Sequence, residues 1–260
     1  TWSQQPPMSK SRTIDSIFAR LYLEPRLELE QTFGKLPNPE SLERGILNFS
    51  QDAGAAKING TNGERAGYNF TIVDLNNDGY DDVVIGAPYN NSSNGIESGA
   101  VFIFLGKPYF DIFNDTINAT VIINGSDAGD HFGWSLSNAS DLNGDNIYDL
   151  VVGAPDNASS RGSVYVFFGN TSWTEGSRYY YSARTDSNGT FNGSSPGDKF
   201  GWSVAGLGNV NGTGPLDIYG DFIVGAPFND TTGQTDAGRA YVYLGDGYTL
   251  WSPTTAIETI

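Results

Sequence analysis

Several residue types are scarce in this chain. It has no cysteine, a single histidine, and 14 basic against 30 acidic residues. The lack of cysteine excludes a disulfide framework, although a chain of 260 residues can bury a core without one. The net charge of −16 produces a surface that repels nucleic acid. No run of 18 apolar residues occurs, so no segment is expected to span a membrane.

Catalytic signatures are scarce as well. A Ser-His-Asp triad would depend on His131, and no G-x-S-x-G, H-E-x-x-H or phosphate-loop motif is present. Carboxylates are abundant, and a glycosidase would need only two of them. The acidic loops described below account for most of these carboxylates in another way. We therefore expect a protein that is not an enzyme.

Glycine and aromatic residues are plentiful. The chain has 33 glycines, 13% aromatic and 38% hydrophobic residues. Glycine at this frequency, together with Asn and Asp, indicates many tight turns, and the hydrophobic share is sufficient for a packed core. The composition predicts a β-protein without long helices.

A sequence unit occurs three times. The tripeptide Gly-Ala-Pro begins at Gly86, Gly153 and Gly225, each time after a short apolar run. A polar loop and a second apolar run follow, and these runs occupy residues 100–105, 163–168 and 240–244. Short β-branched and aromatic runs bounded by glycine are typical of strands paired in hairpins. Each unit is expected to contain a strand, an acidic loop, a strand, a hairpin loop and a strand, with one more strand leading in.

A second shared piece precedes each Gly-Ala-Pro. It reads Gly-Asp-His-Phe-Gly-Trp at 129–134 and Gly-Asp-Lys-Phe-Gly-Trp at 197–202, whereas Ala66 replaces the phenylalanine in the first unit. The Phe-Gly and Gly-Ala-Pro pair, separated by an acidic loop, resembles the FG-GAP repeat of the integrin alpha-type β-propeller. The resemblance implies an all-β fold of three four-stranded antiparallel blades. An integrin-type ring would have seven blades, so we expect the ring to be incomplete within this chain.

The resemblance also predicts the domain limits. Residues 46–250 form the repeat domain, with blades at about 46–110, 111–178 and 179–250. Residues 1–45 are either a cap on the first blade or an arm that docks onto a neighbouring subunit. Residues 251–260 are a C-terminal strand or tail, and could open a further blade.

Two acidic loops fit the pattern D-x-N-x-D-x-x-x-D. Calcium prefers six to eight hard oxygen ligands, which alternate side chains at positions 1, 3, 5 and 9 can supply together with the backbone carbonyl of position 7. Position 6 must turn sharply, and Gly79 or Asn146 tolerates a left-handed conformation. An Asx-rich turn without metal is the alternative, but it would leave three acids close together. The predicted calcium ligands are Asp74, Asn76, Asp78, Tyr80 and Asp82 in loop one, and Asp141, Asn143, Asp145, Ile147 and Asp149 in loop two.

The third loop has lost acidic residues. Its candidate ligands are Asn209, Asn211, Thr213, Asp217 and Asp221. Asp217 occupies the ninth position by count, whereas Asp221 occupies it by alignment to the following strand. Fewer charges predict weaker calcium binding, or none, at this loop.

Fifteen Asn-x-Ser/Thr sequons are present, against about four expected from composition, and such sequons mark surface loops of secreted glycoproteins. The alternative is a bias toward turn residues. Asn69 and Asn211 are the poorer candidates, because the first lies beside the Phe-Gly position and the second in a calcium loop. The predicted glycosylation sites are Asn48, Asn59, Asn90, Asn91, Asn114, Asn118, Asn124, Asn138, Asn157, Asn170, Asn188, Asn192 and Asn229.

These features predict an extracellular, calcium-binding glycoprotein that is secreted or lies at the cell surface. The resemblance implies a protein-recognition or adhesion module that binds through loops on one face, to which Tyr89, Trp173 and Phe228 could contribute. The alternative is a structural subunit of a glycosylated filament or cell-surface assembly that polymerises through its terminal segments. The expected partners are other proteins or copies of this chain.

Overall fold

The computed structural model describes residues 58–107, 115–210, 218–231, 233–245 and 256–259. All of these lie within one compact unit, residues 56–260. The predicted N-terminal segment 1–45 lies outside the described residues. So do the candidate ligands Asn211, Thr213 and Asp217 and the sequon residues Asn48 and Asn114.

The first sheet contains the Gly-Ala-Pro hairpin of the first unit. Its strands lie in the order β1-β2-β3-β4-β8. The first four are antiparallel neighbours, and β8 joins β4 in parallel. Their bounds are β1 (Asn69–Val73), β2 (Asp82–Ala87), β3 (Ala100–Phe104), β4 (Val121–Asn124) and β8 (Tyr179–Ser182).

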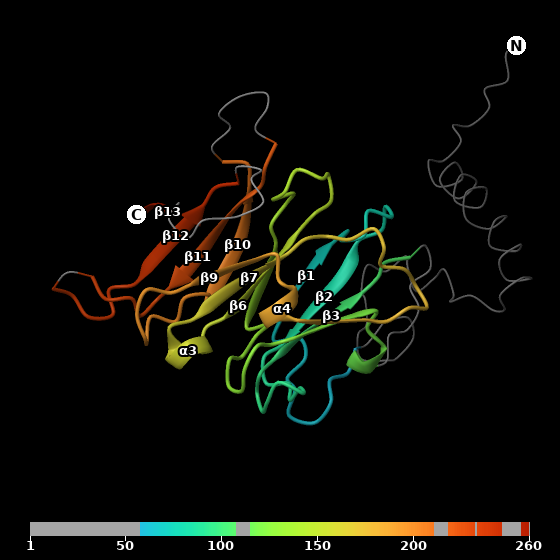
Figure 1. Cartoon of the computed structure of the whole chain (residues 1–260), viewed down its shortest axis with the longest axis horizontal. Coiled ribbons are helices and arrows are strands. Elements are labelled where there is room, and N and C mark those ends of the chain that lie inside the picture. The colour runs from blue at the N-terminus through green and yellow to red at the C-terminus, as the bar shows by residue number, and fades with distance from the viewer. Residues whose placement is uncertain (1–57, 108–114, 211–217, 232, 246–255, 260) are drawn as a thin grey trace, which may run out of the picture. The chain divides into compact units, whose positions relative to one another are not determined.

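The second and third sheets repeat this arrangement with four antiparallel strands each, which confirms the all-β prediction. Figure 1 shows the three sheets side by side in chain order. The second sheet contains β5 (Ser135–Asn138), β6 (Leu150–Ala154), β7 (Ser163–Phe167) and β9 (Gly189–Asn192). The third contains β10 (Ser203–Gly208), β11 (Asp221–Ala226), β12 (Arg239–Tyr243) and β13 (Ala256–Thr259).

The lead-in strands of the second and third units do not join the sheets of those units, contrary to the expectation from the sequence. β4 precedes the Phe-Gly position of the second unit, but it pairs with β3 of the first. In the same way β9 precedes the third Phe-Gly position and pairs with β7. Apart from β8, which joins the first sheet beyond β4, the sheets therefore span 69–124, 135–192 and 203–259, and each lead-in segment pairs with the sheet before it.

In the part of the chain that the structure describes, helical structure is limited to single turns. These are η3 (Thr116–Asn118), α3 (Asn157–Ser160) and α4 (Ala183–Asp186). Ala158 and Ser159 have positive φ, so α3 is a tight turn more than a regular helix. Among the described residues, no helix is both long and apolar enough to cross a membrane.

The core lies between the sheets. Val101, Ile103 and Val121 of the first sheet pack with Val152 and Tyr165 of the second. Val151, Val164 and Val166, on the opposite face of the second sheet, pack with Phe222 and Val224 of the third. Strands buried on both faces explain why the apolar runs in the sequence are continuous.

The phenylalanine of each Phe-Gly pair fills the space between its own sheet and the sheet before it. Phe132 is 0% exposed and lies edge-on to Tyr165 and Phe167. Phe200 is 1% exposed and lies edge-on to Tyr241. In the first unit, Ala66 packs at the edge of a separate cluster that includes Ile85 and Phe102.

Candidate functional site

Two sets of loops lie at opposite ends of the inner strands β1, β5 and β10. The acidic loops follow these strands, and the Phe-Gly turns precede them. A five-residue strand such as β1 separates its two ends by about 17 Å. The fold thus creates an acidic end, where the acidic loops lie, and an aromatic end, where the Phe-Gly turns lie.

Acidic loop one is closed by its own side chains. Asp74 accepts hydrogen bonds from the backbone N–H groups of Asp78 and Gly79, at 3.2 and 2.9 Å. Asn76 donates to the carboxylate of Asp78 at 2.9 Å. Asn77 and Gly79 have φ of 57° and 89°. The left-handed turn predicted at Gly79 is therefore present.

Acidic loop two has the same construction. Asp141 accepts hydrogen bonds from Gly144 and Asn146, at 2.6 and 2.7 Å, and Asn143 donates to Asp145 at 3.0 Å. Gly144 and Asn146 have φ of 79° and 67°. The turn predicted at Asn146 is present, and in both loops the first aspartate accepts hydrogen bonds from the backbone N–H groups of the turn.

The ninth-position aspartate is buried in all three units and joins the loop to the end of the hairpin. Asp82 accepts hydrogen bonds from Leu75 and Gly106, at 2.9 and 2.8 Å. Asp149 and Asp221 make the matching pairs, the former with Leu142 and Gly169 and the latter with Val210 and Gly245. Asp221 therefore takes the structural place of Asp82 and Asp149, as its alignment to the strand predicts.

Burial changes the acidity of these groups. Desolvation raises the pKa of Asp82 to about 6, although hydrogen bonds from Gly106 and Leu75 oppose the shift. Desolvation also raises the pKa of Asp149 to about 7, against hydrogen bonds from Gly169 and Leu142. Repulsion from the two other acids of each loop adds to both shifts. Ionisation of these two carboxyl groups therefore costs free energy unless a positive charge lies nearby.

The donor set of loop one fits a hard cation. Asn76 is 6% exposed, and its Oδ1 is buried without a hydrogen-bond partner. A buried acceptor oxygen of this kind is costly unless a donor or a cation satisfies it. Among the described residues, no three acidic or histidine side chains are already drawn together around one point, because Asp74, Asp78 and their counterparts contact loop amides.

Each acidic loop also contacts the next sheet. Leu75 O accepts a hydrogen bond from Asn170 N at 2.7 Å, and Asn76 donates to Trp173 O at 3.2 Å. In loop two, Asp141 O accepts from Gly220 N at 2.6 Å. The conformation of these two loops is thus coupled to the packing between neighbouring units.

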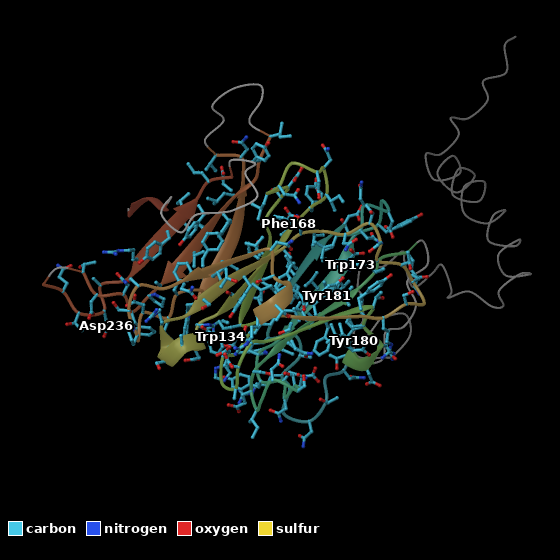
Figure 2. All side chains as sticks on the ribbon, viewed as in Figure 1. Trp134, Phe168, Trp173, Tyr180, Tyr181 and Asp236 are labelled. Atoms are coloured by element: carbon cyan, nitrogen blue, oxygen red, sulfur yellow. The ribbon has the colours of Figure 1, made fainter. Side chains whose placement is uncertain are left out.

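The aromatic end carries a continuous row of rings. The residue after the Phe-Gly position of each unit is aromatic, including the first unit with its Ala66, and the rings of Tyr68, Trp134 and Trp202 follow one another at 4.7 and 4.8 Å. Phe228 extends the row beyond Trp202 at 5.9 Å, and Tyr89 flanks Trp134 at 6.5 Å. Tyr68, Trp202 and Phe228 are 44%, 37% and 43% exposed. Figure 2 labels Trp134 within this row.

Sequence reasoning had found only part of this surface. Tyr89 and Phe228 lie in the row, but Trp173 does not, because it is 5% exposed and its indole N–H donates to Tyr181 at 2.9 Å. Trp173 is therefore a buried residue and not a surface contact. Tyr68, Trp134 and Trp202 were missed, although an aromatic residue after Phe-Gly in every unit was a usable signal.

Charged groups border the aromatic row. The guanidinium of Arg65 lies 4.0 Å from the centre of the Tyr89 ring. His131 Nδ1 lies 2.8 Å from a carboxylate oxygen of Asp156, which also pairs with Lys199. Hydrogen bonds from Lys199, His131 and Ser160 outweigh the effect of burial and lower the pKa of Asp156. His131 is thus held by Asp156, and no serine hydroxyl is hydrogen-bonded to it among the described residues.

The sequons fall into two groups. The amide nitrogens of Asn157 and Asn229 donate to the carboxylates of Asp130 and Asp198, each at 2.7 Å. In contrast, Asn91 and Asn188 are exposed and use only the side-chain oxygen, which accepts from Glu97 N and Phe168 N. Asn59, Asn118 and Asn192 are also exposed, and Asn90, Asn124, Asn138 and Asn170 are half-buried.

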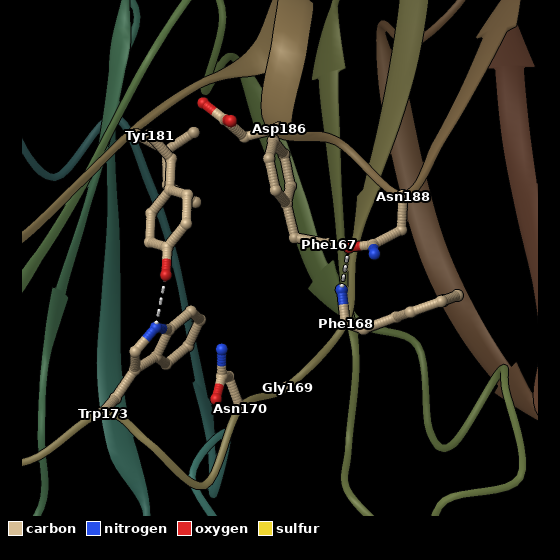
Figure 3. Close-up of a pocket in the computed structure, with 9 residues that line it drawn as sticks. Phe167, Phe168, Gly169, Asn170, Trp173, Tyr181, Asp186 and Asn188 are labelled. Atoms are coloured by element: carbon tan, nitrogen blue, oxygen red, sulfur yellow. Dashed lines mark hydrogen bonds between the residues drawn. The ribbon is translucent and has the colours of Figure 1, made fainter.

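One pocket of about 200 Å³ lies at the seam between the first two sheets. Figure 3 shows that the Trp173–Tyr181 hydrogen bond forms one wall and the Phe168–Asn188 hydrogen bond another. The pocket is open and small. Its lining residues are Ile123, Phe167, Phe168, Gly169, Asn170, Trp173, Tyr181, Asp186 and Asn188.

Comparison with known proteins identifies relatives of the repeat region. The FG-GAP repeat family matches residues 66–104 and 132–167. Integrin alpha-PS5 of Drosophila melanogaster is 33% identical over 165 residues, which cover 64% of this chain and 15% of that protein. Integrin alpha-8 of Gallus gallus is 31% identical over 186 residues, with coverage of 68% and 15%.

A third relative bears the name of an enzyme. Phosphatidylinositol-glycan-specific phospholipase D of Bos taurus is 32% identical over 192 residues, which cover 71% of this chain and 21% of that protein. The matches therefore span 15–21% of the length of these three relatives. The similarity concerns the repeats and not the whole relatives.

Proposed function

Because this chain is an FG-GAP repeat protein similar to integrin alpha chains, we propose that it is an extracellular, calcium-binding and N-glycosylated recognition module of the adhesion type. The row of exposed rings at one end of the inner strands carries this proposal. Exposed aromatic residues are enriched in protein-binding surfaces, because they bury a large area at a low cost in side-chain entropy.

Calcium is proposed for the acidic end. Asp74, Asn76, Asp78 and Asp82, with the carbonyl of Tyr80, would hold one ion. Asp141, Asn143, Asp145, Ile147 and Asp149 are their counterparts in loop two. The unsatisfied Oδ1 of Asn76 and the raised pKa values of Asp82 and Asp149 support a cation at these loops. A bound ion would neutralise the acids and stabilise the contacts with the next sheet.

The third loop is proposed to bind calcium more weakly. Asp221 keeps its structural place, and Asn209 is exposed at the start of the loop. The remaining candidate ligands Asn211, Thr213 and Asp217 stay predictions. The loop has fewer acids than the first two, and charge count is one of the main determinants of calcium affinity.

Glycans are proposed at exposed sequons whose side-chain nitrogen is not engaged in a hydrogen bond. An N-linked glycan replaces a hydrogen on the side-chain nitrogen. That nitrogen is engaged in Asn157 and Asn229, whereas Asn91 and Asn188 use only the oxygen.

We also propose that the chain itself has no enzymatic activity. Its single histidine is tied to Asp156, and the buried acids are accounted for by the loops. The phospholipase relative is similar over only 21% of its own length, which does not transfer its activity to this chain.

The test is an adhesion assay on surfaces coated with the full chain. In millimolar calcium we expect cells to attach to the wild type. Trp202→Ala and Phe228→Ala should reduce attachment severalfold, whereas Tyr180→Ala, which removes a still more exposed ring from β8 at the edge of the first sheet, should not. Absence of attachment, or equal loss in all three variants, would contradict the proposal.

A further inference from the structure

Asn170, which begins one of the sequons, has three of its four polar groups engaged. Its backbone N–H donates to Leu75 O at 2.7 Å, and its carbonyl oxygen accepts from Trp173 N at 3.1 Å. Its side-chain oxygen accepts from the backbone N–H and the hydroxyl of Ser172, at 2.9 and 2.7 Å. Among the described residues, no group accepts a hydrogen bond from its side-chain nitrogen. The residue is therefore held firmly, and the atom that a glycan would modify is the one left free.

This free nitrogen faces the pocket of about 200 Å³ at the seam between the first two sheets. Asn170 lines the pocket. Figure 3 shows its side-chain nitrogen on the side of the Trp173 ring, with the side-chain oxygen turned away. Because Asn170 is half-buried, a group joined to this nitrogen would begin inside the pocket.

The pocket has the size and lining of a site for one sugar ring. Pockets for drug-sized ligands usually exceed about 300 Å³, so a smaller occupant is expected here. Phe167 and Trp173, each 5% exposed, and the half-buried Tyr181 supply aromatic surface. One face of a pyranose ring carries mainly C–H groups, which suit such a surface. Asp186 and Asn188 are exposed polar groups of the same lining, within reach of sugar hydroxyls.

Asn188 begins a second sequon in the pocket lining, but it does not need the pocket. Its side chain is exposed, so a glycan there can extend directly into solvent. The amide of Asn170, in contrast, cannot turn outward without breaking both of its bonds to Ser172. The pocket is therefore assigned to Asn170.

We propose that Asn170 carries an N-linked glycan whose first sugar fills this pocket and joins the first two sheets. The inference rests on the N-glycosylation proposed for the chain, and it adds a half-buried sequon to the exposed ones. The lining comes from both sheets, since Ile123 and Tyr181 belong to β4 and β8 and Phe167 belongs to β7. A sugar between them would bury apolar surface on both sides and stabilise the junction. The rest of the glycan would leave through the open side of the pocket.

The first experiment follows the release of glycans from the native full chain, secreted from a glycosylating host. A peptide N-glycosidase cleaves the bond between the asparagine nitrogen and the first sugar, so it must reach that sugar. Site-resolved mass spectrometry should find Asn170 occupied and losing its glycan at least tenfold more slowly than Asn118, whose sequon is exposed. After denaturation of the chain, both glycans should be released completely.

The second experiment compares melting temperatures of chain made with and without glycans. Ser172→Ala removes the sequon and Ser172→Thr retains it, and the position is exposed, so both variants should fold. Ser172→Ala should lower the melting temperature by about 3 °C more in the glycosylated chain than in the unglycosylated one. This difference cancels the loss of the hydroxyl bond to Asn170. Ser172→Thr should keep both the glycan and the melting temperature.

Asn118→Gln is the matched control, because it removes a glycan from an exposed sequon. Its effect should differ between the two preparations by less than about 1 °C. Three results would each overturn the pocket assignment and leave the exposed sequons as proposed: an empty Asn170 beside occupied Asn91 and Asn118, release as fast as from Asn118, or equal effects of Ser172→Ala in both preparations. A chain without glycans at any sequon would refute the pocket assignment and the proposed glycosylation together.

Discussion

The side-chain nitrogen of Asn229 lies 2.7 Å from a carboxylate oxygen of Asp198, and both residues are nearly fully buried. The same pair recurs one unit earlier as Asn157 and Asp130. Because a carboxylate only accepts hydrogen bonds, the orientation of each amide is fixed. The recurring sequon after Gly-Ala-Pro therefore has a structural role in these two units.

Glycan mapping should separate the two groups of sequons. We expect mass spectrometry of chain secreted from a glycosylating host to find Asn91 and Asn188 occupied and Asn157 and Asn229 empty. A glycan on Asn229 would replace one of the two hydrogens that its nitrogen donates to Asp198 and Ser194, so one of these bonds would break and the buried side chain would have to become exposed. Substantial occupancy at Asn229 would contradict the hydrogen-bonding role.

Replacing Asn229 should cost stability even without glycans. Asn229→Ala leaves the carboxylate of Asp198 without that donor, and we expect a loss of about 1–3 kcal/mol in the free energy of unfolding. Asn118→Ala, at an exposed sequon, is the control and should change stability by less than about 0.5 kcal/mol. Urea unfolding of unglycosylated protein checks both values.

Calcium should raise the melting temperature. Each occupied loop contributes about 2.7 kcal/mol at a calcium concentration one hundred times its dissociation constant. Asp78→Asn should weaken loop one about tenfold, because it removes one of the charges that set affinity. Asp81→Asn, the exposed neighbour outside the proposed ligand set, should not. Titration calorimetry that finds no calcium binding in the wild type would refute the metal proposal.

The Phe-Gly phenylalanines should be essential to packing between sheets. Phe132→Ala and Phe200→Ala should each cost about 3–5 kcal/mol, since both rings are fully buried. Ala66 has no such ring, so Ala66→Gly should cost less than about 1.5 kcal/mol. Chemical denaturation in chelator isolates these costs from calcium. Equal losses at all three positions would show that the first unit packs as the others do.

Stability should fall in acid partly because of Asp156. The pKa of Asp156 is lowered in the folded protein, so its contribution is present above the unfolded value of about 3.9 and is lost as the pH falls through the lower, folded value. Asp156→Asn should therefore make the melting temperature less dependent on pH below about 4. Glu175→Gln, in the exposed pair with Lys107, should leave the profile nearly unchanged. Parallel profiles for wild type and Asp156→Asn would contradict the lowered pKa.

Local sequence signals predicted much of the fold. Apolar runs and Gly-Ala-Pro turns identified β2, β3, β6, β7, β11 and β12, and the left-handed turns at Gly79 and Asn146 followed from residue type. Which strands pair with one another was harder to predict from the sequence. Whether β4 pairs forward or backward depends on contacts distant in sequence, and nothing in its own residues records that choice.

The candidate site was predictable to a similar extent. The acidic loops were found because their ligand spacing is local. The row of rings was found only in part, because Tyr68, Trp134 and Trp202 meet through the packing of separate sheets. Trp173 was misplaced for the same reason, since its burial depends on Tyr181 of the strand that joins the first sheet.

The outer strands have a consequence for how such chains gain or lose repeats. Because β4 and β9 pair with the sheet that precedes them, a genetic cut made directly after β3 or β7 would leave one sheet without that strand and the next unit with a surplus one. A duplicated segment that folds without rearrangement must instead end after β4 or β9. The heritable unit therefore runs from one Phe-Gly turn to the strand that ends just before the next.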